Sequence, residues 1–572
     1  MSGPTPDRGN LDAILATAEH DRTRLNSSAL GAFSLTLLGV ASVVGAGIFV
    51  VTGDAAAHYA GPAVLISFIL AGIVAALTAL CYAELASMIP AAGSTYSYAF
   101  AAFGSFVGWF IGWDLLLEYL FAASTVAVGW SGYFDSLLDS FGVHLPHALI
   151  TAPFGDDPGI INLPAMAIMF LTSGALWLGT RESAVANNLM VLLKLSILAL
   201  VVVVGVFYIS SSNFEPFLPA SEGGFGDFGW SGVFRGAGIV NLPAMAIMFL
   251  TSGALWLGTR ESAVANNSMV LLKLSILALV VGVGIFYVSS SNFEPFLPTS
   301  EGGFGDFGWS GVFRGAGIVF FAYIGFDAVS TAAAEARNPR RTVPIGLLGT
   351  VIIATTIYIA VGFVLTGMVN YRELGVADPI AVALQAGGRD LDWLLKLTDV
   401  AAVVGLASTV LVTLYGQTRI FMRMSEDGML PPAFGRVSKR TKTPQFSIVL
   451  CGIVGGIVAG LVPLSVLGEL ISIGTLLAFI IVSAGVLTLR RRYPDLPRPF
   501  RVPALPLVAG TAIVSSLALM ATLPGDTWIR LGVWAALGLC VYFLYARAHS
   551  KETMGAISAG ITSRPEPAPE DA

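Results

Sequence analysis

About fourteen apolar segments, each of roughly 20 residues, run through this chain, and that length lets a helix cross a bilayer. Hydrophobic residues make up 55% of the 572 positions and charged residues only 12%, which excludes an ordinary soluble protein. Because lipid offers backbone groups no hydrogen bonds, the spans must be helical, and we expect an all-α polytopic membrane protein. The expected spans are 31–52, 62–87, 102–130, 162–180, 187–209, 241–259, 266–288, 311–334, 343–368, 393–422, 446–463, 467–489, 503–523 and 528–547.

The first span carries a break in its middle, where Gly45, Ala46 and Gly47 interrupt the apolar sequence GVASVVGAGIFVVTG at 39–53. Unwound backbone at membrane depth is tolerated where it lines a cavity or holds a ligand. A half-helix restarting at Gly47 would direct its positive N-terminal end at a bound carboxylate. The same small residues would also suit a helix-packing face, and both interpretations stay open at this stage.

Lysine and arginine placement predicts the orientation of the chain, because cytoplasmic loops are enriched in these residues. Basic groups follow three of the spans: Arg337, Arg340 and Arg341; Arg436, Lys439, Arg440 and Lys442; and Arg490, Arg491, Arg492, Arg498 and Arg501. The loops at 139–158 and 210–230 lack Lys and Arg. We therefore expect both termini inside the cell, with a tail at 1–28, a membrane domain at 29–550 and a disordered tail at 551–572.

A tandem duplication lies inside the membrane domain, since residues 162–240 and 241–319 align without a gap. The two copies differ at five positions only: Leu189/Ser268, Val203/Gly282, Val206/Ile285, Ile209/Val288 and Ala220/Thr299. Each copy holds two expected spans, so the insertion preserves the orientation of everything after it. We expect one copy to lie outside the ancestral bundle.

A second break follows at Gly325, Phe326 and Asp327, and two interrupted helices are typical of inverted-repeat transporters. Five ordered motifs accompany the breaks: GAGIF in the first span, CYAELAS at 81–87, GWDLLLEY at 112–119, FFAYIGFDAVSTAAAEARNP at 320–339 and LYGQTRIFMRMSEDGMLP at 414–431. With these motifs the chain resembles the cationic amino acid transporter family, within the amino acid-polyamine-organocation superfamily. The duplicated block is the one large departure, because such permeases normally have twelve spans.

The resemblance implies a five-plus-five inverted-repeat core like that of the leucine transporter, with two accessory C-terminal helices. It implies substrate bound between the two broken helices. The expected substrate-binding residues are Val43, Gly45, Ala46, Gly47, Ile48, Glu118, Phe320, Phe321, Ala322, Ile324 and Asp327. Amides of the first break would hold the substrate carboxylate, and carbonyls of the second its ammonium. Phe321 and Phe326 are candidate gates, although aromatic residues in spans also serve packing.

Two lysines inside the duplicated spans are candidates for proton coupling, Lys194 in the first copy and Lys273 in the second. The resemblance implies that one of them stands where sodium binds in sodium-coupled relatives, and that loss of its proton breaks a contact with the first break. The alternative is a lysine that reaches the cytoplasmic interface. Ser268 and Gly282 suit burial against protein better than Leu189 and Val203, which favours Lys273 as the core lysine.

Acidic side chains at bilayer depth complete the candidate residues. Asp114 and Glu118 are four positions apart and share one helical face, directed inward if Trp113 and Leu117 face elsewhere. Glu118 would attract a cationic substrate tail, and an internal ion pair is the alternative. Asp327 could instead cap amides at the break. Glu84 is expected to pair with a cytoplasmic arginine.

We therefore expect a secondary active transporter of the plasma membrane that imports cationic or small neutral amino acids by alternating access. The expected coupling ion is the proton, with sodium second, and the expected surroundings are the lipid bilayer. The alternative is an amino acid sensor or a paralogue inactivated by the duplication. No catalytic motif occurs, and we expect no enzymatic activity, cofactor, metal site or nucleic-acid partner.

Overall fold

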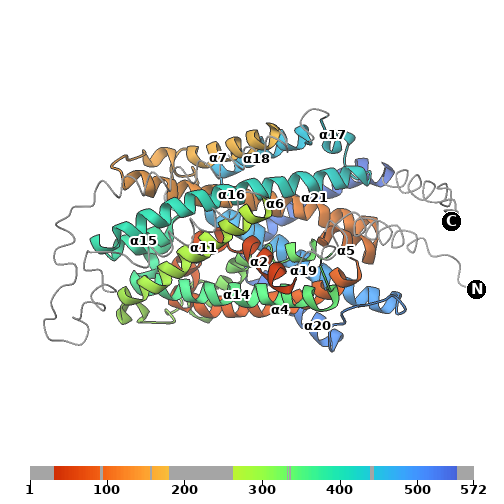
Figure 1. The fold of residues 1–572 in the computed structure, drawn as a ribbon, viewed down its shortest axis with the longest axis horizontal. Helices are drawn as coiled ribbons and strands as arrows, with labels where there is room; N and C mark the ends of the chain where they lie inside the picture. The colour runs from red at the N-terminus through yellow and green to blue at the C-terminus, as the bar shows by residue number, and fades with distance from the viewer. Residues whose placement is uncertain are drawn as a thin grey trace, which may run out of the picture.

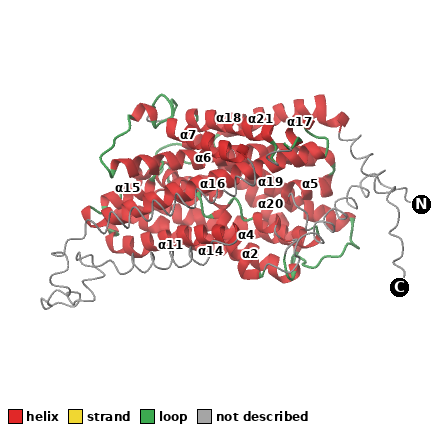
Figure 2. Cartoon of the chain, turned by 45° about the horizontal axis from the view of Figure 1, so that its top comes forward, coloured by secondary structure: helices red, strands yellow, loops and turns green. Residues whose placement is uncertain are grey.

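The computed structural model describes residues 31–89, 94–154, 158–178, 262–331, 333, 336–438 and 443–549. Helices form all the regular structure in these ranges, and no strand occurs among them (Figure 2). Within the same ranges, seven helices are long and apolar enough to cross a membrane, and four shorter apolar helices accompany them. The all-helical, polytopic membrane class expected from the apolar segments is therefore confirmed. The expected spans at 187–209 and 241–259 lie outside the described residues.

Most described helices begin and end within a few residues of an expected span. The unbroken ones that match are α4 (Val64–Met88), α6 (Ser105–Asp139), α7 (Leu163–Leu178), α11 (Ser262–Gly284), α14 (Pro339–Met368), α16 (Asp392–Glu426), α18 (Gln445–Leu461), α19 (Leu464–Arg492), α20 (Leu505–Thr522) and α21 (Gly525–Val541). Three shorter helices lie in connections: α5 (Ser94–Phe103), α15 (Pro379–Ala386) and α17 (Pro432–Gly435).

Two of the spans are assembled from consecutive helical pieces. The first consists of α2 (Ala32–Val43), the wide turns η1 (Gly47–Val51) and η2 (Ala56–Ala60), and α3 (Thr52–Ala55) between them. The second consists of α12 (Gly308–Val319), η8 (Phe320–Tyr323) and α13 (Ala328–Thr331). The interruptions fall at the two glycine-containing sequences in which the analysis above expects them.

Long helices from distant parts of the chain pack side by side around these broken spans. α6 lies along α16, α4 along α14, and α7 along α18. The helix α11 crosses the bundle in contact with α14, α16 and α2 (Figure 1). The broken spans are thus enclosed by intact helices, which keeps their unwound backbone away from lipid.

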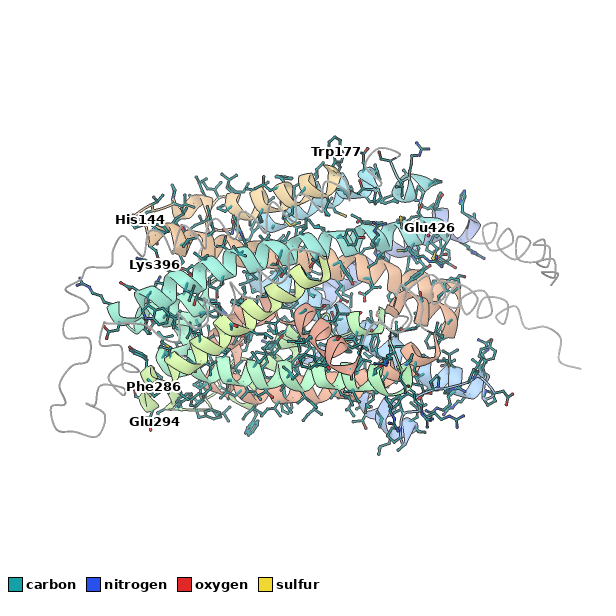
Figure 3. All side chains as sticks on the ribbon, viewed as in Figure 1. His144, Trp177, Phe286, Glu294, Lys396 and Glu426 are labelled. Carbon is teal, nitrogen blue, oxygen red and sulfur yellow. The ribbon has the colours of Figure 1, made fainter. Side chains whose placement is uncertain are left out.

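The two ends of the bundle can be identified from labelled residues. His144, Phe286, Glu294 and Lys396 lie toward one end, and Glu426 lies toward the opposite end (Figure 3). A partly buried ion pair joins the ends of α4 and α19.

In that ion pair, Glu84, near the end of α4, accepts hydrogen bonds from the guanidinium of Arg490 at the end of α19. The carboxylate also accepts the amide of Val502 at 2.8 Å and lies 3.5 Å from Arg498 Nε. The expected partnership of Glu84 with an arginine of a basic loop is confirmed.

We expected one copy of the duplicated block to lie outside the bundle, but both copies contribute helices to it. The helix α7 belongs to the first copy, at 162–240, whereas α11 belongs to the second, at 241–319. In the described bundle the first copy therefore supplies α7, whereas the second supplies α11 and α12. The chain between α7 and α11 exceeds an ordinary connection by one repeat.

Deleting residues 180–258 should leave the described bundle intact. The deletion removes one repeat of 79 residues and joins Gly179 to Thr259, which recreates the Gly-Thr junction present in each copy. Because α7 and α11 are both retained, we expect a monodisperse protein in detergent with a melting temperature close to that of the full chain. Size-exclusion chromatography and thermal unfolding measure this result. Aggregation of the shortened chain would contradict the assignment of α7 and α11 to different copies.

Candidate functional site between the broken helices

The first break opens the backbone at Val44 and Gly45. The α2 helix ends at Val43, and the next residue, Val44, adopts an extended conformation with ψ of 94°. The helix then resumes, with the amides of Ile48 and Phe49 donating to the Gly45 carbonyl at 3.2 and 3.3 Å. The first amides of a helix have no acceptor within it, so this restart presents donors and a partial positive charge.

The second break opens the backbone at Ile324 and Gly325. Tight turns at Phe320–Tyr323 end the first half, and Ile324 is extended, with ψ of 139°. Gly325 has φ of +100°, a conformation that side chains strongly disfavour. The chain re-enters a helix when Ser330 donates from its amide to the Asp327 carbonyl at 2.7 Å. The end of the first half presents carbonyl oxygens and a partial negative charge.

The two breaks meet backbone to backbone. A Cβ atom on Gly47 would lie 2.3 Å from the Cα of Ala322, so only glycine permits this approach. On the other side, a Cβ on Gly325 would lie 2.9 Å from the carbonyl oxygen of Ser42. The amide-bearing restart of one helix therefore lies against the carbonyl-bearing end of the other. This arrangement can bind a zwitterion, with its anionic end at the first break and its cationic end at the second.

Tyr358 of α14 bridges the breaks. Its hydroxyl oxygen lies 2.9 Å from the Val43 carbonyl oxygen and 2.7 Å from the Ala322 carbonyl oxygen. The single hydroxyl proton is shared between these acceptors, one from each break. Because Tyr358 is fully buried, the bridge satisfies carbonyl groups that helix interruption leaves without partners.

Lys273 of α11 lies against the first break. Its ammonium donates to the Thr409 hydroxyl of α16 at 2.8 Å and lies 3.5 Å from the Val44 carbonyl oxygen. Its Cε would lie 3.0 Å from a Cβ on Gly405, so a small residue makes room for the chain. The side chain is 7% exposed, and no carboxylate pairs with it among the described residues. The lysine thus joins α11, α16 and the break through neutral acceptors. The other candidate lysine, Lys194, lies outside the described residues.

The structure places the remaining expected residues on or beside the breaks. Val43, Gly45, Ala46, Gly47 and Ile48 surround the first break, and Phe320, Phe321, Ala322, Ile324 and Asp327 surround the second. Glu118 of α6 is 6% exposed and lies within electrostatic range of Asp327. The candidate gate Phe326 packs edge-on against Tyr82 and Phe479, with ring centroids 5.5 and 5.1 Å apart.

Of the two residues expected to face away from Asp114 and Glu118, Trp113 packs on α21, whereas Leu117 lies beside Asp114 against Gly474 of α19. The Trp113 indole donates to the Trp534 carbonyl of α21 at 2.9 Å and stacks on the Trp534 ring. Asp114 and Glu118 are buried, and neither forms an ion pair with another described residue. The alternative interpretation of an internal ion pair at these residues is not supported in the described part of the chain.

Sequence reasoning missed two residues of this site, Tyr358 and Thr409. Each is a polar residue inside an apolar segment, TTIYIAV for Tyr358 and GLASTVLV for Thr409. Such hydroxyls commonly bond to carbonyls of their own helix, as Thr409 also does with Gly405 at 3.0 Å. The hydroxyl groups alone therefore could not have distinguished these two residues from their many neighbours.

Replacing Gly47 with alanine should abolish the transport activity implied by the resemblance, because the new methyl group would overlap the backbone of Ala322. The breaks would be forced apart. Uptake of labelled alanine into proteoliposomes measures the effect. The matched control is Gly510→Ala in α20, where a Cβ meets no atom within 4 Å, and it should retain uptake. Equal activity of the two variants would contradict the close approach of the breaks.

Replacing Tyr358 with phenylalanine should lower stability by about 1–3 kcal/mol, because a buried carbonyl loses its donor while the ring remains. Thermal unfolding in detergent, with and without alanine, measures the change. Ligand stabilisation should shrink as well, since the two breaks are no longer tied to each other. A variant with unchanged unfolding and unchanged ligand response would show that the bridge is dispensable.

Comparisons with known proteins agree with this geometry. A family model described as amino acid permease matches residues 30–243 and again 238–536. A methylthioribose transporter of Bacillus subtilis (strain 168) is 38% identical, covering 91% of this chain and 94% of its own. A branched-chain amino acid permease of the same organism is 37% identical, covering 96% and 99% respectively. The vacuolar cationic amino acid transporter 2 of Arabidopsis thaliana is 32% identical over 81% of this chain and 59% of its own. The chain is a multi-pass membrane transporter, not an enzyme, and it belongs to the amino acid permease family.

Proposed function

We propose that this permease is a proton-coupled secondary transporter that imports cationic or small neutral amino acids by alternating access. The observation that carries the proposal is the contact between the two breaks, with Lys273 bonded beside them. The amide end, the carbonyl end and a movable ammonium are the components that such a cycle requires.

A five-plus-five inverted repeat is the architecture that we propose for the core. In its support, α2 packs on α14 while α12 packs on α4, so each broken span contacts the intact helix that follows the other. The pairs α4 with α14, α6 with α16 and α7 with α18 are those expected across a two-fold relation. The helices α20 and α21 are then accessory, and the duplication brings the total to about fourteen spans. In this assignment, residues 29–550 form one transport domain.

In the proposed binding mode, the substrate carboxylate accepts from the amides of Ala46, Gly47 and Ile48. Its ammonium donates to carbonyls among Phe320, Phe321, Ala322 and Ile324. The substrate side chain points toward Glu118 and Asp327, whose negative charge would favour a guanidinium or ammonium tail. Small neutral amino acids would use the backbone contacts alone.

Proton coupling would act through Lys273. When it is protonated, the ammonium ties α11 to Thr409 and to the Val44 carbonyl, as a bound cation would. Loss of the proton removes the charge and weakens both contacts, which frees the first broken helix to move relative to α11 and α16. A lysine suits this role better than an arginine, because a guanidinium group does not lose its proton in proteins.

The proposed location is the plasma membrane, with both termini cytoplasmic. Figure 1 shows α17, which Arg436 follows in the chain, at the end of the bundle that also holds Glu426, and this favours a cytoplasmic assignment for that end. Several plant relatives carry the names of other membranes, such as vacuolar and chloroplastic. Microscopy of a tagged chain in its source cells tests the location.

The test of function is uptake of labelled arginine and alanine into proteoliposomes under an inward proton gradient or an equal sodium gradient. We expect uptake with the proton gradient only. Labelled methylthioribose belongs in the same assay, because a relative at 38% identity is named for that compound. Binding of amino acids without uptake would instead indicate a sensor, and sodium-driven uptake would exclude the lysine mechanism.

Substituting the two candidate lysines separates their roles. Lys273→Gln should lose proton-driven uptake, since a neutral amide cannot release a proton to switch the contacts with Thr409 and Val44. Lys194→Gln is the matched change in the other copy, at the equivalent sequence position, and it should transport nearly as well as the unmodified protein. If Lys194→Gln lost uptake and Lys273→Gln did not, the coupling lysine would be Lys194 of the first copy.

A further inference from the structure

The buried carboxyl group of Asp114 has no part in the binding mode proposed above. Asp114 of α6 is 3% exposed, and both of its carboxyl oxygens are buried without a hydrogen-bond partner. Other buried carboxylates differ in this respect. Asp399 accepts from the Ser136 hydroxyl at 2.9 Å, and Glu469 accepts from the Thr527 hydroxyl and from Arg530.

Among the described residues, no basic side chain forms an ion pair with Asp114. From α19, Gly474 lies against the carboxyl, since a Cβ there would be 3.1 Å from Oδ1, and the next residue is Thr475. From α16, the amide group of Gln417 donates to the Leu116 carbonyl at 3.3 Å. From α5, Tyr96 donates its hydroxyl to Asp427 at 2.8 Å.

The charged groups around this part of α6 are mostly acidic. Glu118, one turn further along α6, is within electrostatic range of both Asp114 and Asp327. Arg423 of α16 lies 3.4 Å from Asp427 and 3.7 Å from Glu426, so its charge is already compensated there.

An ionised carboxylate in such a place would be a buried charge with no counter-ion and no hydrogen bond, which is strongly unfavourable. Asp114 must therefore carry a proton in this conformation. A carboxyl group that stayed neutral throughout would give a buried helix no advantage over leucine. An acid that meets water in another conformation can release its proton there. Asp114 is about 14 Å along α6 from Ser105, measured from the end of the bundle that holds Glu426.

We propose that Asp114 is a second proton-binding site of the transport cycle, in addition to Lys273. The carboxyl holds one proton in the conformation described here. It releases that proton to water as a carboxylate when motion against α19 opens the Glu426 end, and it takes up another from the opposite side. The inference rests on the proposed proton-coupled function, and it adds one proton to each transported substrate.

The experiment measures how many protons move with each alanine. The membrane potential of the proteoliposomes is clamped at zero. The ratio of internal to external alanine at which net flux vanishes then changes by about tenfold per unit of pH difference for each coupled proton. If Lys273 and Asp114 each carry one proton per transport cycle, this alanine ratio should change by about 100-fold per pH unit in the full-length protein. In Asp114→Asn, which keeps the shape of the side chain but cannot bind or release a proton, the alanine ratio should change by about tenfold per pH unit.

Asp526→Asn serves as the matched control, because it removes an exposed carboxylate from the start of α21 and should match the unmodified protein. An Asp114→Asn protein that folds and keeps the 100-fold ratio would overturn the proposal. A tenfold ratio in the unmodified protein would overturn it without any variant, even if Asp114→Asn failed to fold. A complete absence of proton dependence in the unmodified protein would instead refute the proposed function itself.

Discussion

The contact between Gly47 and Ala322 is the constraint on which the rest of this bundle depends. Two helices can be interrupted at bilayer depth only if the freed backbone groups find partners or a ligand. Here the interruptions face each other, and the absence of a side chain at Gly47 brings the two backbones together. Tyr358 then bonds to a carbonyl from each break. The intact helices α4, α6, α14 and α16 enclose this centre and exclude lipid from it.

This arrangement concentrates charge effects where substrate would bind. The restart of the first broken helix is positive, the end of the second is negative, and Lys273 lies beside the first. The buried carboxyl groups of Glu118 and Asp114 come from α6, which packs on α16 and α19. The site therefore combines fixed partial charges from backbone with side chains that can gain or lose a proton.

The helical class, most span boundaries and both breaks could be predicted from the sequence, because long apolar segments and the glycines within them are local signals. The assignment of the duplicated helices could not. The two copies have the same sequence over the length of α7. Only packing in the folded protein therefore shows that α7 comes from the first copy and α11 from the second. Composition favoured Lys273 over Lys194 through Ser268 and Gly282, but Gly282 is exposed and the Ser268 side chain lies outside the described residues, so that reasoning is not confirmed. Tyr358 and Thr409 were missed because their roles depend on contacts with residues far away in the chain.

The most direct test of the central claim is a structure determined with a bound amino acid such as arginine. The account predicts the substrate carboxylate at the amides of Ala46, Gly47 and Ile48 and its ammonium at carbonyls of Phe320, Phe321, Ala322 or Ile324. The side chain should extend toward Glu118. Substrate bound elsewhere, with Gly47 and Ala322 still in contact and unoccupied, would contradict the claim that the meeting of the two breaks forms the transport site.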